Sequence, residues 1–226
     1  MTTVTPTVGL ASRHQVVRDF VGYFPRLLKW QVPVTAAALG VALLLWKQSG
    51  VESTTNAVWL LRAVVVVMTA GSIFLLDDAS ANMSEPVATP LRFRTGVRLA
   101  AMTAAIAVGC VPAIALVAGR ALIRGAWFGV LIEAATFATV AVAVSLWLQR
   151  RRGVAEPGQY GAMSVVLTFL AAHAVGARWP MLALPSSDWT AAHWRWAALL
   201  LVAGAAILVN LRDPAAAPWR SALRRG

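Results

Sequence analysis

Three ionisable residues lie within long apolar segments of the sequence, namely Arg62, Glu133 and His173. A charged side chain is costly in lipid, so such residues face protein, water or one another and often mark the path of a substrate or an ion. Glu133 is about two helical turns into its segment and therefore needs a base such as Arg62 or Arg120 nearby. It is either a functional residue or half of a structural pair. Arg62 has a further alternative, because a long side chain can extend its charge outward to the membrane surface.

A pair of carboxylates, Asp77 and Asp78, opens the longest polar interruption of the chain, FLLDDASANMSEPVATPLRFRTGVR, which covers residues 74–98. Two adjacent carboxylates are typical of acid/base or metal chemistry. Here they follow an apolar segment, and negative charge is unfavourable at the C-terminal end of a helix. Basic groups must therefore compensate them. We interpret residues 77–95 as a cytoplasmic loop that contacts a partner protein.

The composition identifies the class of protein that positions these residues. The chain of 226 residues is 59% hydrophobic and 13% charged, with a mean hydropathy of +0.69, whereas a soluble domain is roughly 25% charged. Since a membrane-spanning helix needs about 20 residues, we predict an all-α, multi-pass membrane protein with six spans in one domain, residues 30–211. The expected spans are 30–46, 57–76, 96–118, 126–148, 162–182 and 194–211, the third interrupted by Pro112.

The chain ends are predicted to lie outside the spans. Residues 1–10 read as disordered. Ser12 and Gln15 form a capping box that opens an amphipathic helix over 11–29, and we expect that helix to lie in the membrane interface, with packing on a partner protein as the alternative. Residues 212–226 form a basic tail.

The basic residues indicate the orientation of the spans. Fourteen of the 20 Lys and Arg residues fall in the N-terminal segment, the 77–98 region, the run at 150–152 and the C-terminal tail, and five fall in the alternate loops. Cytoplasmic loops are enriched in Lys and Arg, so both termini and the 77–95 loop are expected to be cytoplasmic. The net charge of +11 is thereby explained as a topology signal, and no nucleic-acid partner is predicted.

Motifs for catalysis are weak. The sequence lacks the G-x-x-x-x-G-K-[ST] loop that cradles phosphates, and His14, His173 and His193 lack the spacing of a metal site. Ser186, His173 and Asp188 offer only a weak triad signal. We therefore predict no catalytic residue, no metal, and no enzymatic activity in this chain.

The order of parts resembles the membrane subunits of type-2 ABC exporters, and FLLDDASANMSEPVATPLRFRTGVRLA is similar to a pattern in small actinobacterial permeases of that kind. The resemblance implies that residues 79–85 form a coupling helix on a cytoplasmic ATP-binding subunit, with residues 90–94 returning the chain to the bilayer. The implied partner-binding residues are Asp77, Asp78, Ala79, Ser80, Asn82, Met83, Ser84, Glu85, Pro90, Arg92 and Arg94.

The resemblance also implies a bacterial plasma membrane location, a dimer with a second copy or a paralogue, and ATP and Mg held by the partner subunit rather than this chain. The expected function is a permease subunit that exports a hydrophobic or amphipathic compound, with Arg62, Glu133 and His173 as translocation candidates. The alternative is a membrane scaffold or sensor that binds a cytoplasmic partner without transport. A lipid-modifying enzyme is a weaker third hypothesis, because it requires carboxylates or histidines gathered at one membrane face.

Overall fold

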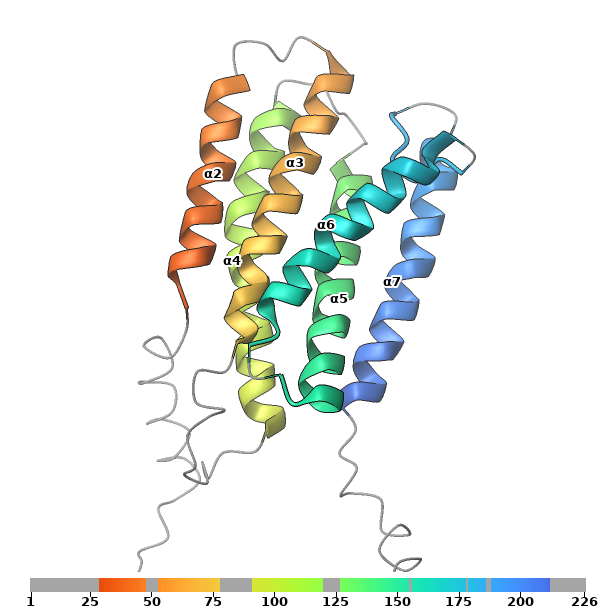
Figure 1. The fold of residues 1–226 in the computed structure, drawn as a ribbon. Coiled ribbons are helices and arrows are strands. Elements are labelled where there is room, and N and C mark those ends of the chain that lie inside the picture. The colour runs from red at the N-terminus through yellow and green to blue at the C-terminus, as the bar shows by residue number, and fades with distance from the viewer. Residues whose placement is uncertain are drawn as a thin grey trace, which may run out of the picture.

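The fold is a bundle of α-helices, seen in a computed structural model of the chain (Figure 1). The structure describes residues 29–47, 53–77, 91–119, 127–154, 156–177, 179–185 and 188–211, with the backbone alone at 47, 91–94, 116–119 and 177. Within these ranges the chain forms helices and no strand. The helices are α2 (Gln31–Lys47), α3 (Thr54–Ser72) continued by the 3-10 helix η2 (Ile73–Leu76), α4 (Leu91–Gly119), α5 (Trp127–Arg152), α6 (Gly158–Ala174) continued by η3 (Val175–Ala177), and α7 (Trp189–Leu211).

Helix α3 occupies the centre of the bundle. It packs against α2, α4, α5 and α6, whereas α7 packs mainly on α5. In the most apolar 18-residue stretch of each, 67% of α3 with η2 is buried but only 11% of α7. The remaining apolar side chains of α7, such as Leu201 at 75% exposed, face outward, as expected for a helix in contact with lipid.

The protein is a helical membrane protein. Four helices are long and apolar enough to cross a bilayer: Thr54–Leu76, Thr95–Ala115, Trp127–Arg152 and Trp189–Leu211; Gln31–Trp46 is apolar but shorter. A helix lies over each of the six apolar segments expected from the sequence. The all-helical membrane class is thus confirmed.

Three boundaries differ from the expectation. The predicted interruption at Pro112 is wrong, because α4 continues through it; neighbouring helices let a membrane helix tolerate proline. The fifth helical segment begins at Gly158 and ends at Ala177 instead of covering 162–182. Helix α7 begins at Trp189 instead of residue 194, which places His193 inside its second turn.

The connecting segment, residues 179–185, is irregular yet well bonded. Its carbonyl groups accept hydrogen bonds from side chains of two helices. Arg195 Nη1 donates to Pro180 O at 2.6 Å, and Trp196 Nε1 donates to Met181 O at 2.7 Å. Two further carbonyls bind α3, as described below. Irregular backbone within a membrane protein needs such partners, because lipid offers none.

Several predicted parts lie outside the described residues. These are the disordered 1–10 segment, the amphipathic helix of 11–29 except Lys29, the greater part of the 77–95 loop, and the tail 212–226. They stay predictions.

We expect Trp196→Ala to destabilise the fold strongly. The Trp196 side chain is fully buried and its ring lies 5.1 Å from that of Phe137. The substitution leaves a cavity and removes the donor to the connecting segment, at a cost of about 3–5 kcal/mol. Thermal unfolding in detergent measures the loss.

Trp147→Ala is the matched control, because Trp147 is 45% exposed on α5. Its unfolding temperature should stay close to that of the wild type. Equal losses in the two variants would contradict the assignment of Trp196 to the core.

Candidate functional site

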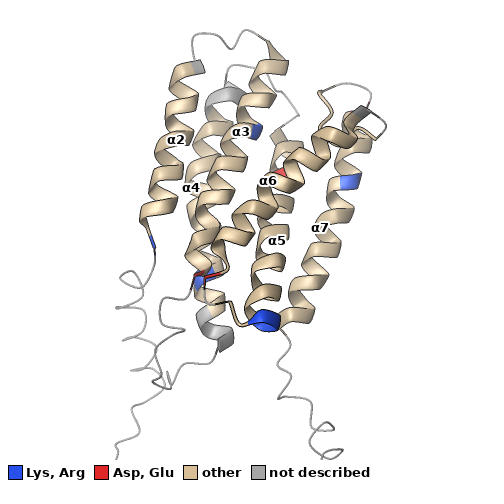
Figure 2. Ribbon diagram, viewed as in Figure 1, with Lys and Arg blue, Asp and Glu red and all other residues tan. Residues whose placement is uncertain are grey.

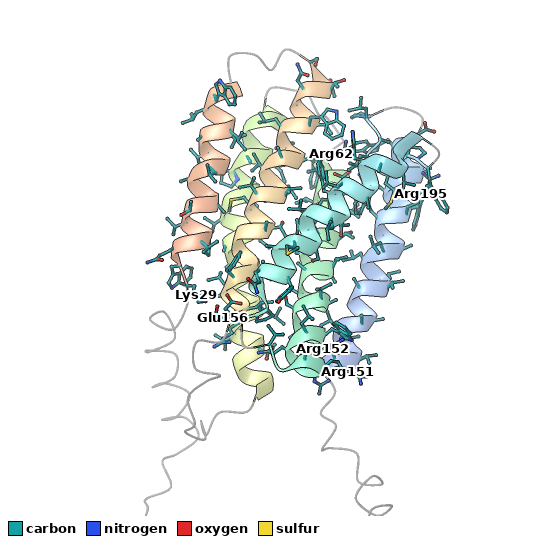
Figure 3. All side chains as sticks on the ribbon, in the orientation of Figure 1. Lys29, Arg62, Arg151, Arg152, Glu156 and Arg195 are labelled. Carbon is teal, nitrogen blue, oxygen red and sulfur yellow. The ribbon has the colours of Figure 1, made fainter. Side chains whose placement is uncertain are left out.

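A buried cluster joins three helices: Arg62 comes from α3, Glu133 from α5 and His193 from α7. At about 1.5 Å rise per residue, all three lie within roughly 12 Å of the ends of their helices. Those ends form the upper part of the bundle in Figure 3, where Arg62 and Arg195 are labelled, whereas Lys29 and Glu156 are at the lower end.

Arg62 and Glu133 form a bidentate ion pair. Arg62 Nε donates to Glu133 Oε2 at 2.8 Å, and Arg62 Nη2 donates to Oε1 at 2.6 Å. Each side chain is 1% exposed. Paired, planar hydrogen bonds of this kind are among the strongest in proteins, and each charge neutralises the other inside the bundle.

The guanidinium also fastens the connecting segment. Arg62 Nη1 donates to Leu182 O at 3.2 Å, and Nη2 donates to Ala183 O at 2.7 Å. The ring of Trp59 lies 5.2 Å from Arg62 Cζ and completes its surroundings with a cation–π contact. All three guanidinium nitrogens are therefore hydrogen-bonded within the chain.

His193 approaches the ion pair from α7 but is not bonded to it. Its Nδ1 lies 2.7 Å from Trp189 O. Since a carbonyl only accepts, Nδ1 carries the hydrogen. Nε2 lies 3.2 Å from Glu133 Oε1, but without the angles of a hydrogen bond, and no hydrogen-bond partner satisfies it among the described residues. In the neutral ring this atom is a buried, unused acceptor.

Gly129 gives the histidine its room. A Cβ at this position would collide with the imidazole of His193 and with the ring of Trp189. The absence of a side chain on α5 therefore lets both α7 rings lie against the helix backbone. The close packing of α7 on α5 at this level depends on that glycine.

A second polar cluster lies at the opposite end of the bundle, next to η2. Asp77 is 3% exposed, and its Oδ1 accepts a 2.7 Å hydrogen bond from the backbone N–H of Gly158, the first residue of α6. Lys29 Nζ lies 3.5 Å from Asp77 Oδ2 and 2.8 Å from Glu156 Oε1. A side chain at Gly158 would collide with Asp77 and with the backbone of Phe74. Asp77 therefore caps α6 from a distant part of the chain.

Two opposing influences act on the Asp77 carboxyl. Burial raises its pKa, and the Gly158 N–H and the Lys29 charge offset part of that rise. The pKa of Lys29 is raised too, chiefly by its hydrogen bond to Glu156 and then by Asp77. The two shifts disagree on whether the Lys29–Asp77 contact is net favourable. We give greater weight to burial, because the 3.5 Å separation is long for an ion pair.

The predicted site residues are only partly brought together. Of the two bases that the sequence offered to Glu133, Arg62 is its partner, and Arg62 does not extend outward to the surface as one alternative held. His173 is exposed on α6, with its ring 5.9 Å from that of Trp59, so it is not the buried candidate that the sequence predicted. Asp77 was expected to bind a partner protein, but its carboxylate is engaged inside the chain.

The other predicted partner-binding residues stay predictions. Arg92 and Arg94 belong to α4, where the structure describes only the backbone, and the remaining residues of that set, Asp78 to Pro90, lie outside the described ranges. His193, by contrast, was overlooked. The expected start of the last span at residue 194 placed it in a loop, and the WTAAHW spacing, which stacks Trp189 and His193 one turn apart, is the signal that identifies it.

Comparison with models of known protein families finds no match for this chain. Curated proteins and solved structures yield no match either. In the described parts of the chain, no three His, Cys, Asp or Glu side chains lie close enough to hold a metal ion. Function is therefore inferred from the geometry of the two clusters.

Removing either member of the Arg62–Glu133 pair should destabilise the protein severely. Arg62→Met or Glu133→Leu leaves a buried charge without its partner, at a cost of about 3–5 kcal/mol. The double variant leaves no charge, so its loss should be smaller than the sum of the two single losses. Thermal unfolding of the three variants in one detergent measures this coupling; strictly additive losses would contradict it.

Asp77 should give the stability a characteristic pH dependence. Because its folded-state pKa lies above the ordinary value of 3.8, the folded chain holds this proton more tightly than the unfolded chain. Its contribution to the free energy of unfolding is therefore largest below pH 3.8 and is lost as the pH rises through the folded-state pKa. Asp77→Asn keeps an oxygen acceptor for Gly158 and should lack this decline.

Asp77→Leu removes the acceptor and should cost about 1 kcal/mol. Glu156→Gln is the control, because its 58% exposed carboxylate belongs to a surface pair worth about 0–1 kcal/mol. Unfolding curves recorded across the acid range compare the variants. An unchanged pH profile in Asp77→Asn would show that this carboxyl does not cause the decline.

Proposed function

We propose that this chain is the six-span permease subunit of an ATP-driven exporter, coupled to a separate cytoplasmic ATP-binding subunit that holds ATP and Mg. The observation that carries the proposal is the way both ends of segment 78–90 are fastened to the bundle. That segment is where the sequence predicts contact with the partner. A load applied there has defined routes into the spans.

The first route starts at Asp77. Its carboxylate binds the N-terminus of α6 at Gly158 and contacts Lys29, which directly precedes α2. The second route starts at α4, where Arg98 Nη1 approaches Leu76 O at 3.4 Å. A push on segment 78–90 would therefore act on α2, α3, α4 and α6 together. Such rigid-body displacement of packed helices is a general means of alternating access.

The distribution of charge supports the orientation that this mechanism needs. Lys29, Glu156, Arg151 and Arg152 lie at the same end of the bundle as Asp77 (Figure 3), and basic residues are concentrated there (Figure 2). By the positive-inside rule this end is cytoplasmic. With α2 and α6–η3 included as spans, six crossings place both termini on the cytoplasmic side of a bacterial plasma membrane.

Dimerisation and export of a hydrophobic or amphipathic compound belong to the same proposal. The permease resemblance supports the dimer, with either a second copy or a paralogue. The outward-facing apolar side chains of the bundle are suited to contact with lipid and with membrane-dissolved compounds.

A scaffold or sensor is the second candidate, and one observation favours it. Between the Arg62 cluster and the Asp77 cluster, the described core is formed by apolar side chains such as Val65, Phe137 and Ala141. The guanidinium nitrogens of Arg62 are also all hydrogen-bonded. A protein that only transmits a signal to a cytoplasmic partner needs no polar track through its spans.

Charge reversal within the 77–95 loop tests the proposal. We expect the tagged wild-type chain, purified in mild detergent from its native host, to bring with it an ATP-binding subunit and ATPase activity. Asp78→Lys combined with Glu85→Lys should reduce both about tenfold or more, since opposed charges at an interface are strongly unfavourable. Asp77 is left unchanged, because its substitution disturbs α6.

Asp188→Lys serves as the control, because this exposed carboxylate is at the opposite end of the bundle. Co-purification of the ATP-binding subunit with the Asp78/Glu85 double variant at wild-type level would refute the assignment of the loop. A wild-type preparation without any nucleotide-binding partner would favour the scaffold or sensor.

A further inference from the structure

A groove of about 410 Å³ lies between α5 and α7 beside the buried cluster. Phe128, Gly129 and Ile132 line it from α5, and Trp189, His193 and Trp194 line it from α7. Phe128 is 60% exposed and Trp194 is 73% exposed, so the groove opens sideways to the surroundings of the bundle. Its walls are chiefly apolar and aromatic, as in most sites for small molecules.

The groove has one unsatisfied polar group in its wall. His193 is 7% exposed, and its Nδ1–H is donated to Trp189 O. Nε2 therefore presents an acceptor lone pair, and the nearest oxygen, Glu133 Oε1, is itself an acceptor that already binds Arg62. A buried acceptor without a donor costs about 1–3 kcal/mol. A ligand that supplies a hydrogen-bond donor recovers that free energy.

The electrostatics indicate what kind of donor fits. The charges of Arg62 and Glu133 compensate each other at 2.6 Å, so the groove has no uncompensated ion behind it. A neutral hydroxyl satisfies Nε2 without bringing a charge into an apolar site, whereas a carboxylate offers no donor at all. The rings of Trp127, Trp189 and Trp194 at the starts of α5 and α7 correspond to the headgroup level of a membrane, where the hydroxyl of an amphipathic molecule also lies.

We propose that the groove between α5 and α7 binds an uncharged amphipathic molecule whose hydroxyl group donates a hydrogen bond to His193 Nε2 while its apolar part lies along Ile132 and Trp194. Nε2 is shielded from solvent, and the Trp189 ring lies 4.1 Å from the imidazole. Binding therefore requires a small displacement of the Trp189 ring. The inference deepens the proposed function by giving a chemical class for the compound, and it rests on that function only for the step of transport.

Photolabelling of the purified full-length chain tests the site without ATP or a partner subunit. The probe is a long-chain primary alcohol that carries a diazirine beside its hydroxyl, and its methyl ether is the matched control. We expect the alcohol to label α5 and α7 at concentrations about tenfold lower than the ether needs, because the ether lacks the donor. Equal labelling by the two probes would overturn the proposal and leave the groove as a site for apolar chains only.

Two variants locate the interaction. His193→Phe keeps an aromatic ring but removes the acceptor, so it should abolish the difference between alcohol and ether. Ile132→Trp fills the groove away from the ion pair and should reduce labelling by both probes. Thermal unfolding of each variant reports on folding, and the probe pair on the wild-type chain decides the outcome even where a variant fails to fold.

The outcome is separable from that of the docking experiment. Loss of the alcohol preference with intact co-purification of an ATP-binding subunit would refute the ligand site alone. Preferential labelling by the alcohol in a chain that has no ATP-binding partner would retain the ligand site and refute the exporter.

Discussion

The structure depends on one constraint, which is that charge cannot remain unpaired in the apolar interior of a helix bundle. Arg62 and Glu133 satisfy it for each other, and the guanidinium then has donors left for Leu182 O and Ala183 O. One side chain thus joins α3, α5 and the segment that leads into α7. The contact contributes more to the arrangement of these elements than to net stability, because the desolvation of two buried ions offsets much of their attraction.

The opposite end of the bundle applies the same rule more gently. Asp77 closes the N-terminus of α6, where negative charge is favourable, and Lys29 lies within reach of it. The carboxylate that seems badly placed at the end of α3 is therefore well placed at the start of another helix. The two clusters fasten the ends of the bundle, and the long apolar stretch between them is free to be uniform.

Much of this arrangement could be anticipated from composition and periodicity. Apolar runs identified the helices to within a few residues, and the cost of a buried carboxylate required a base for Glu133. Three features could not be anticipated, because each depends on contacts between distant parts of the chain. Asp77 was assigned to a partner since its acceptor role depends on Gly158, 81 residues away. His173 and His193 exchanged places because helix boundaries decide which of them faces inward, and the six-span count and the partner remain proposals.

The Arg62–Glu133 pair also imposes a condition on how the protein is made. The two residues are separated by 71 positions in the chain, and synthesis proceeds at about 5–20 residues per second. Arg62 is therefore inserted roughly 4 to 14 seconds before its counter-ion exists. During that interval the arginine needs a temporary host, in the insertion machinery or at the membrane surface. Helix α3 settles into the centre of the bundle only after α5 has been delivered.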